Sequence, residues 1–276
     1  KTCARRGGEA GGAGVRVIDT VGGGEDTLDM ECNGTAELRL AAKADSPLLM
    51  FTNETVQSAL ELRDRNNKAI STDLSIALRN ITVETDPDYL SETAIDQKNG
   101  LSLIADSGTK AGSTQITVGY AFTYLDKDYH ATSSIALRIV TPEIVLKPVV
   151  FTFASGSQEQ SQYQTYTGNG ADEFTVSAEG KQLEISGLTI TDFEEVLQEY
   201  KDILLVEWAK NAQGQAQSGT LSISAYPQTI YPAYASVRVQ FQYEYAGSTH
   251  IVWKDLMVQI NETTEGGAEG TEEVEP

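Results

Sequence analysis

The chain is poor in the residues that build most metal-binding and catalytic sites. Its 276 residues include only two cysteines, two histidines and two tryptophans. Two cysteines without a second pair cannot supply the ligands of a structural zinc site. Basic residues are also scarce, since 20 Lys and Arg stand against 40 Asp and Glu, for a net charge of −20. Nucleic acids and anionic lipid surfaces both require a basic patch, so the composition argues against both as partners.

Long apolar runs are missing as well. No stretch approaches the roughly 18 apolar residues that a membrane-spanning helix needs, so we expect no direct membrane span. Apolar residues nevertheless make up 40% of the chain, which is enough for folded cores. At about 150 residues per domain, the length predicts two domains.

The two ends of the chain differ in composition from its centre. Residues 1–24 contain eight glycines around one short β-like run, so we interpret residues 1–25 as a flexible leader with one potential strand. Val15, Val17 and Ile18 would be the donor residues if this strand completed the sheet of a neighbouring subunit. Residues 261–276 carry six Glu and no Lys or Arg, which predicts an acidic flexible tail over residues 263–276.

The only cysteines, Cys3 and Cys32, lie near the start of the chain. They could close a disulfide loop worth roughly 3 kcal/mol in an oxidising compartment. Alternatively, Cys3 is a lipid-anchoring or intermolecular thiol, or both thiols are free.

Four of the nine asparagines open an Asn-x-Thr triplet, the acceptor sequence of N-glycosylation. They are Asn33, Asn53, Asn80 and Asn261. Composition alone would give about one or two such triplets with this motif. The excess favours an extracellular glycoprotein at a cell surface, with coincidence as the alternative.

Alternating runs of β-branched and aromatic residues dominate the chain between its ends. The clearest cover residues 35–40, 116–124, 135–139, 237–245 and 256–260. In the run Ile116-Thr-Val-Gly-Tyr-Ala-Phe-Thr-Tyr124, every second residue is large and apolar. A period of two predicts strands with one buried face and one solvated face.

These runs recur at an offset of 120 or 121 residues. Alternate residues from Ile116 to Tyr124 match those from Val237 to Tyr245, and His130 matches His250. Earlier blocks match at smaller offsets, so the second copy carries an insertion. We call residues 26–141 the first repeat and residues 142–262 the second repeat, with the boundary near Pro142 because proline marks a crossing between units.

The insertion contains the one predicted helix. Thr191 and Glu194 have the spacing of a capping box. Phe193, Val196, Leu197 and Tyr200 then follow at helical spacing. We therefore expect a short helix of two to three turns in the second repeat.

About seven strands per repeat, their spacing and the repeat itself resemble the immunoglobulin-like β-sandwich superfamily, as found in tandem surface and adhesin modules. The resemblance covers residues 26–262 and predicts an all-β fold of two tandem Greek-key sandwiches with one short helix inserted in the second. It implies a scaffold for spacing, adhesion or assembly, and it carries no functional residues.

Sequence motifs for catalysis are missing. There is no nucleophile elbow and no phosphate-binding loop. His130 and His250 occupy equivalent points of the two repeats, which favours a structural role over catalysis. The acidic loops at 84–88 and 126–128 lack the spacing of a calcium-binding loop. We therefore expect no enzyme, no cofactor and no metal.

A Tyr-rich connection in the second repeat is the one candidate binding site. Tyr226, Tyr231 and Tyr234 lie within the segment Tyr226-Pro-Gln-Thr-Ile-Tyr-Pro-Ala-Tyr234. Exposed tyrosines give contact area to a glycan or protein partner at little entropic cost. Packing over the edge of the sandwich is the alternative.

The sequence thus favours a non-enzymatic, structural or adhesive protein at an extracellular surface. It would be a stalk or pilin-like filament subunit that associates with itself, assembled by donation of the N-terminal strand. Two alternatives remain: a glycan- or receptor-binding surface module that uses the 226–234 loop, and an immunoglobulin-like virion or phage decoration protein.

Overall fold

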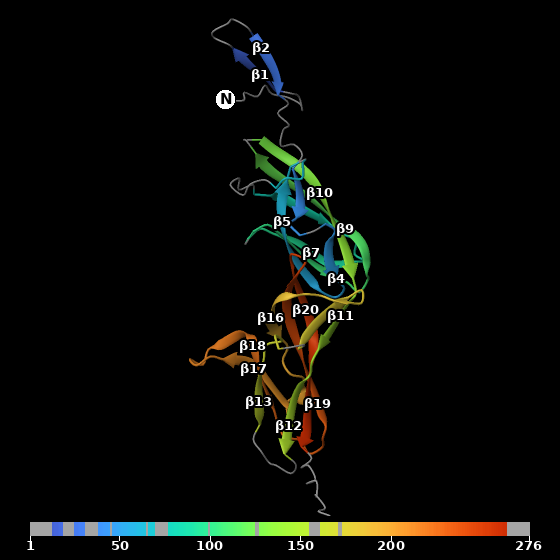
Figure 1. The fold of residues 1–276 in the computed structure, drawn as a ribbon, viewed down its shortest axis with the longest axis vertical. Coiled ribbons are helices and arrows are strands. Elements are labelled where there is room, and N and C mark those ends of the chain that lie inside the picture. Colours follow the sequence, from blue (N-terminus) through green and yellow to red (C-terminus); the bar gives the residue numbers. More distant parts are fainter. Residues whose placement is uncertain are drawn as a thin grey trace, which may run out of the picture. The chain divides into compact units, whose positions relative to one another are not determined.

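The structure, a computed structural model, describes residues 13–18, 25–30, 38–44, 46–64, 66–69, 77–98, 100–124, 127–154, 161–170 and 173–263. The predicted Cys3–Cys32 disulfide and the sequon at Asn33 lie outside these residues, as does the acidic tail beyond Thr263. Within them the fold is all-β, which confirms the fold class predicted from the sequence (Figure 1).

Ten strands precede residue 141 and belong to the leader and the first repeat. They are β1 (Ala13–Ile18), β2 (Glu25–Met30), β3 (Arg39–Ala42), β4 (Leu48–Phe51), β5 (Thr55–Arg63), β6 (Arg79–Glu84), β7 (Leu90–Asp96), β8 (Ser102–Ser107), β9 (Gly112–Tyr124) and β10 (Lys127–Val140).

Ten further strands and one 3-10 turn make up the second repeat. The strands are β11 (Pro142–Leu146), β12 (Val149–Ala154), β13 (Gln162–Tyr166), β14 (Phe174–Ala178), β15 (Lys181–Gln182), β16 (Ser186–Phe193), β17 (Leu204–Lys210), β18 (Ala216–Ala225), β19 (Ala233–Tyr245) and β20 (Ser248–Thr263). The 3-10 turn, η2, covers Gln198–Tyr200.

In each repeat, an early strand runs parallel to the last strand and pairs with it. In the first repeat β4 runs parallel to β10, with Leu48 opposite Leu137. In the second repeat β12 runs parallel to β20, with Val149 opposite Val258. The aligned segments of the sequence therefore occupy equivalent positions in the sheets.

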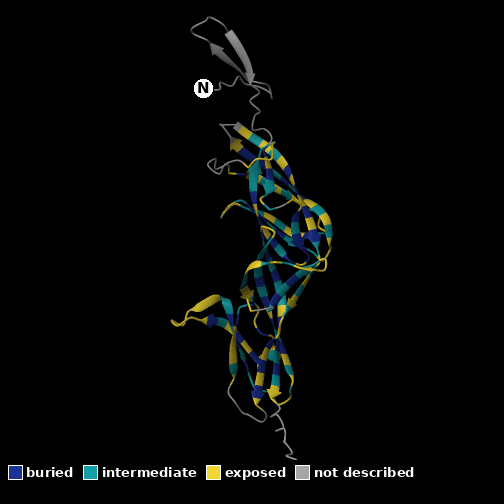
Figure 2. Ribbon diagram, viewed as in Figure 1, coloured by how far each residue is buried: buried dark blue, intermediate teal, exposed yellow. Residues whose placement is uncertain are grey.

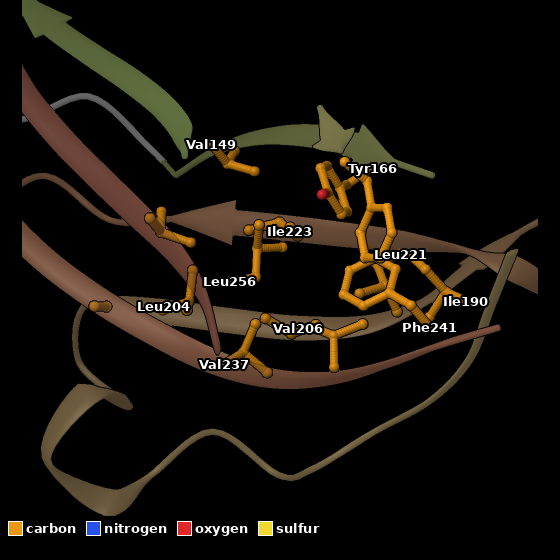
Figure 3. Close-up of a cluster of buried hydrophobic side chains, with 14 of the residues drawn as sticks. Val149, Tyr166, Ile190, Leu204, Val206, Leu221, Ile223, Val237, Phe241 and Leu256 are labelled. Atoms are coloured by element: carbon orange, nitrogen blue, oxygen red, sulfur yellow. The ribbon is translucent and has the colours of Figure 1, made fainter. Parts of the chain in front are cut away.

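A β-sandwich core fills the second repeat. Strands β13, β18 and β17 form one sheet, and β16, β19, β20 and β12 belong to another. Their inward residues form one hydrophobic cluster (Figure 3). Leu221, Val239 and Leu256 are fully buried in it. At roughly 1.5–3 kcal/mol per buried aliphatic side chain, this cluster is the main stabilising element of the repeat.

The predicted helix at residues 191–200 is wrong in extent and in its cap. Thr191 and Phe193 belong to β16, and the Thr191 hydroxyl bonds to the Gln240 side chain instead of capping a helix. Only η2 is helical, and it has no side-chain cap. Pairing of Phe193 with Val239 and packing of its ring on Trp208 favour the strand, so tertiary contacts override the local signal.

Strand β20 connects the sheets of the two repeats. From Ser248 to Ile260 it pairs with β19. On its other edge, residues Val258–Thr263 pair with β12, and Ser248–Ile251 pair with Thr55–Ser58 of β5. We call this last four-residue pairing the β5–β20 seam. Through it β5, β8 and β7 continue the sheet that contains β16, β19 and β20.

Contacts divide the chain into two compact units that do not follow the order of the sequence. One unit contains residues 1–41, 61–82 and 117–134, and the other contains residues 42–60, 83–116 and 135–276. The second unit therefore includes the β5–β20 seam and the core of the second repeat. The domain boundaries expected from the sequence stay a prediction.

The proposed donor segment pairs within its own chain. Residues of β1 pair antiparallel with β2, with Val15 opposite Leu28 and Val17 opposite Asp26. Among the described residues, this hairpin is a two-stranded sheet of its own. The sequence reading of a lone strand did not anticipate the second strand, because Glu25–Met30 is acidic and has no clean alternation.

Candidate functional site

A buried cluster of ionisable side chains lies beside the β5–β20 seam. Both carboxylate oxygens of Glu54 accept hydrogen bonds from the Tyr243 hydroxyl, at 2.9 and 3.0 Å. His250 Nδ1 lies 3.3 Å from Glu54 Oε2. Glu54 is 3% exposed, and Tyr243 and His250 are fully buried. We call these three residues the Glu54 cluster.

The backbone of the β4–β5 turn fixes the position of Glu54. Its amide donates to Ser107 Oγ at 3.2 Å, and the Ser107 amide donates to the Glu54 carbonyl at 3.0 Å. The Ser107 hydroxyl also bonds to the Phe51 carbonyl. Asn53, at the tip, adopts a positive φ of 59°, a conformation that asparagine tolerates better than most residues. The turn therefore directs a carboxylate into the protein interior.

Aromatic rings enclose the imidazole of His250. The Tyr243 ring stacks on it at 5.2 Å with an interplanar angle of 11°, and the Phe51 ring lies at 5.0 Å. Neither nitrogen of His250 has a hydrogen-bond partner of good geometry among the described residues. The approach of Nδ1 to Glu54 is therefore an electrostatic contact.

The environment of the cluster holds Tyr243 in its neutral form. Burial raises the pKa of the Tyr243 hydroxyl, and the negative charge of Glu54, which accepts its hydrogen bond, raises it further. A neutral hydroxyl can donate to the carboxylate, so the two groups stabilise one another. Burial likewise raises the pKa of Tyr166, with a smaller contribution from the charge of Glu173.

The equivalent position in the first repeat has a different environment. Phe122 occupies the place of Tyr243 and stacks on Tyr129 at 5.3 Å, and His130 is exposed. The hydroxyl of this repeat is on Tyr120 instead, where it donates to the Leu38 carbonyl at 3.0 Å and lies 2.9 Å from Ser133 Oγ. Only the second repeat therefore places its histidine against a carboxylate in the interior.

The predicted Tyr-rich site is largely packed. Tyr226 and Tyr231 are half-buried, and Tyr231 contacts the core of the second repeat. The Tyr231 hydroxyl accepts a hydrogen bond from the Gln228 amide at 2.9 Å. Tyr234 lies in β19 and is 52% exposed. Of the three predicted ligand-binding tyrosines, Tyr234 alone offers most of its ring to solvent.

A second exposed aromatic residue lies on the sheet of β13, β18 and β17. Tyr163 is 74% exposed and pairs with Ser224, whose partner on the other side is Leu205. Tyr163 itself lies in β13. Its short strand lacks alternating apolar residues, so the pattern could not identify it.

Two of the four sequons have exposed asparagines. Asn53 lies at the tip of the β4–β5 turn and Asn80 lies in β6, and both side chains are exposed. Asn261 is half-buried in β20 and accepts a hydrogen bond from Gln259 at 3.0 Å. Glycosylation of these residues stays a prediction.

An open groove of about 530 Å³ lies on the described surface. It is lined by residues 111–113 and 138–141 together with Glu179. The two charged side chains that line it, Arg138 and Glu179, pair with one another, so they are not directed at a ligand. Among the described residues, no three His, Cys, Asp or Glu side chains gather as a metal site would require. No helix in the described part of the chain is long and apolar enough to cross a membrane.

Comparison with known proteins gives no family. No family model matches the chain, and no curated protein matches it. Solved structures match only weakly. The surface layer protein SbsC, domains 4–9, has a TM-score of 0.28 and 12% identity over 88% of this chain and 34% of that one. A chimeric titin Z1Z2 has a TM-score of 0.28 and 9% identity over 82% of this chain and 95% of that one.

A third match has a different activity. An endo-fucoidan hydrolase of glycoside hydrolase family 107 has a TM-score of 0.26 and 12% identity, over 93% of this chain and 35% of that one. The chain spans about a third of the length of the S-layer and hydrolase structures. All three similarities are too weak to assign a function.

Proposed function

We propose that this protein is a non-enzymatic structural or adhesive component of an extracellular surface, acting as a stalk or filament subunit. The observation that carries the proposal is the pairing of β20 with β19, β12 and β5. One strand thereby holds segments from both repeats. Interstrand hydrogen bonds lie perpendicular to antiparallel strands, so a pull along β20 loads many of them together.

The N-terminal hairpin supports assembly by strand addition. A two-stranded hairpin is marginally stable in water by itself, and β1 and β2 pair only with one another among the described strands. An open sheet edge of a second copy would complete it by main-chain hydrogen bonding. Val15, Val17 and Ile18 remain the proposed donor residues, now as part of a hairpin.

Deleting residues 1–24 tests this assembly. We expect the full chain to form oligomers by size-exclusion chromatography with light scattering, and the deleted chain to be monomeric. Removal of residues 264–276 is the matched control and should leave the oligomers unchanged. Val17→Pro, which removes one main-chain donor, should weaken association without shortening the chain. An identical mass distribution for the full and N-terminally deleted chains would refute assembly by strand addition.

A second candidate function is recognition of a glycan or receptor by the second repeat. The favouring observation is the exposure of large apolar side chains near the predicted loop: Ile230 is 79% exposed and Tyr234 is 52% exposed. Exposed rings and apolar side chains supply contact area without a deep pocket.

Glycan-array binding tests this second function. We expect binding that Tyr234→Ala abolishes and that the matched variant Tyr163→Ala retains. Tyr231→Ala is less informative, because Tyr231 packs on the core and its loss alters the loop itself. Absence of binding on the array, or binding unaffected by Tyr234→Ala, would eliminate this candidate.

A further inference from the structure

The β5–β20 seam contains polar groups without partners. The seam joins the strands by only four residue pairs, in which Ser58 lies opposite Ser248 and Val56 lies opposite His250. Both serine hydroxyls are buried and have no hydrogen-bond partner among the described residues. A buried polar group without a partner loses its hydration and gains nothing in return. The seam is therefore short and incompletely satisfied, which favours local opening there.

The charge of the adjacent Glu54 cluster depends on how many protons it holds. With the carboxylate ionised and the imidazole neutral, the cluster carries one negative charge. One added proton makes it neutral, either as a carboxylate–imidazolium pair or as two neutral groups. A second proton leaves an imidazolium facing a neutral carboxyl. Because an uncompensated charge in the interior is costly, the state with one added proton is the most compatible with burial.

We propose that Glu54, Tyr243 and His250 form a proton-dependent lock on the β5–β20 seam, which is closed when the carboxyl and imidazole groups share one added proton. The supporting geometry is the position of Glu54 in the β4–β5 turn. From there its carboxylate contacts Tyr243 of β19 and His250 of β20. The carboxylate cannot reach both side chains once β5 separates from β20.

The other charged groups near the lock have partners of their own. Asp106 of β8 accepts a hydrogen bond from Thr55 at 2.6 Å, and Glu244 of β19 accepts one from Thr249 at 2.6 Å. Tyr245 of β19 lies 6.3 Å from His250, ring centroid to ring centroid. From β4 and β14, the aromatic neighbours Phe51 and Phe174 carry no charge. Glu54 therefore provides the one carboxylate in contact with the imidazole.

The lock gives the seam a pH dependence with two limbs. On the acid side the second proton places an uncompensated imidazolium in the interior, and on the alkaline side loss of the shared proton leaves a buried carboxylate held by one hydroxyl. Each limb that involves one proton changes the opening equilibrium by about tenfold per pH unit.

Amide hydrogen exchange of the full chain measures this equilibrium. We expect residues 55–58 and 248–251 to be most protected at an intermediate pH, with less protection at both more acidic and more alkaline pH, after correction for intrinsic exchange rates. Glu54→Gln should remove the alkaline limb, because no carboxylate remains. His250→Gln should reverse the acid limb, because protonation then neutralises the only charge. His130→Gln is the matched control and should leave both limbs unchanged.

Proton NMR provides a test that needs no variant of the lock. The chain has only two histidines, and His130→Gln assigns their signals. We expect the ring signals of His250, which is buried, to change with pH only when the seam opens, and those of His130, which is exposed, to change without any opening. If the His250 signals change with pH as readily as those of His130, or if seam exchange has the same pH dependence in the wild type and in Glu54→Gln, the lock does not exist.

Discussion

The two repeats place equivalent histidines in opposite environments. His130 is exposed near Asp128, an exposed carboxylate whose pKa is lowered by hydrogen bonds from Thr123 and Arg79, by the charge of Arg79 and, least, by His130. His250 is buried against Glu54 and two aromatic rings. Water screens the first pair and is excluded from the second. The same sequence position therefore supports a surface contact in one repeat and a buried proton site in the other.

The largest expected effect comes from removing the carboxylate of the buried pair. Glu54→Ala leaves the Tyr243 hydroxyl and the His250 imidazole without their partner and creates a cavity. We expect a loss of about 3–5 kcal/mol in the free energy of unfolding, measured by urea denaturation at pH 7. Glu92→Ala, at an exposed carboxylate of β7, is the control and should stay within the error of the measurement. A loss of equal size for both variants would contradict a special role for Glu54.

A smaller loss of stability is expected from removing the buried hydroxyl of Tyr120 in the first repeat. Tyr120→Phe removes a buried hydroxyl that contacts the Leu38 carbonyl and Ser133. Losing these two contacts in the interior should cost about 1–3 kcal/mol, although the Ser133 hydroxyl keeps its hydrogen bond from the Leu40 amide. The reciprocal change Phe241→Tyr, at the equivalent position of the second repeat, adds a hydroxyl to a closely packed core and should also destabilise. If Phe241→Tyr is neutral in thermal unfolding, the two cores are more alike than their hydrogen bonds indicate.

Alkaline pH tests a further difference between the repeats, the buried hydroxyl of Tyr243 in the second repeat. Because burial raises the pKa of Tyr243 above the unfolded value of 10.0, the folded state holds this proton more tightly. The resulting stability is fully present below pH 10 and is lost as the pH rises above it. We expect the melting temperature of the wild type to fall above pH 10, and Tyr243→Phe to flatten that fall. An equally steep fall in Tyr243→Phe would assign the effect to Tyr120 and Tyr166, whose pKa values burial also raises.

The smallest effect is expected at the exposed pair of the first repeat. Asp128→Asn removes the ion pair with Arg79. Its lowered pKa means that the ionised carboxylate stabilises the folded state above pH 4 and loses that effect as the pH falls. Solvent screening makes the contribution slight, so thermal unfolding at pH 7 should barely change. A shift comparable to that of Glu54→Ala would overturn the contrast between the repeats.

Much of the architecture could be predicted from the sequence, because it depends on local alternation. The runs at 116–124 and 237–245 lie in β9 and β19, at equivalent positions of the two repeats. The helix at 191–200 could not be judged locally, since pairing of β16 with β19 decides it. Alternation indicates that one face of a strand is buried, but it does not indicate which strands pair with one another.

The Glu54 cluster lay beyond sequence reasoning for the same reason. Glu54 and Tyr243 are 189 residues apart, and a glutamate beside an Asn-x-Thr triplet indicates a solvated turn. The repeat could have provided a weak signal, because Phe122 becomes Tyr243 at a position that is apolar in the first copy. A hydroxyl at an interior position requires a partner, although the sequence does not say which residue supplies it.

The order in which the chain is synthesised gives β20 a kinetic role. β12 pairs with residues of β20 about 110 positions further along the chain, and β5 pairs with residues of β20 at a still larger separation. Until β20 has left the ribosome, β12 and β5 each keep an open edge that other chains can pair with. Contacts of such long range also slow folding. Correct folding of this protein therefore depends on protecting these two edges until β20 is complete.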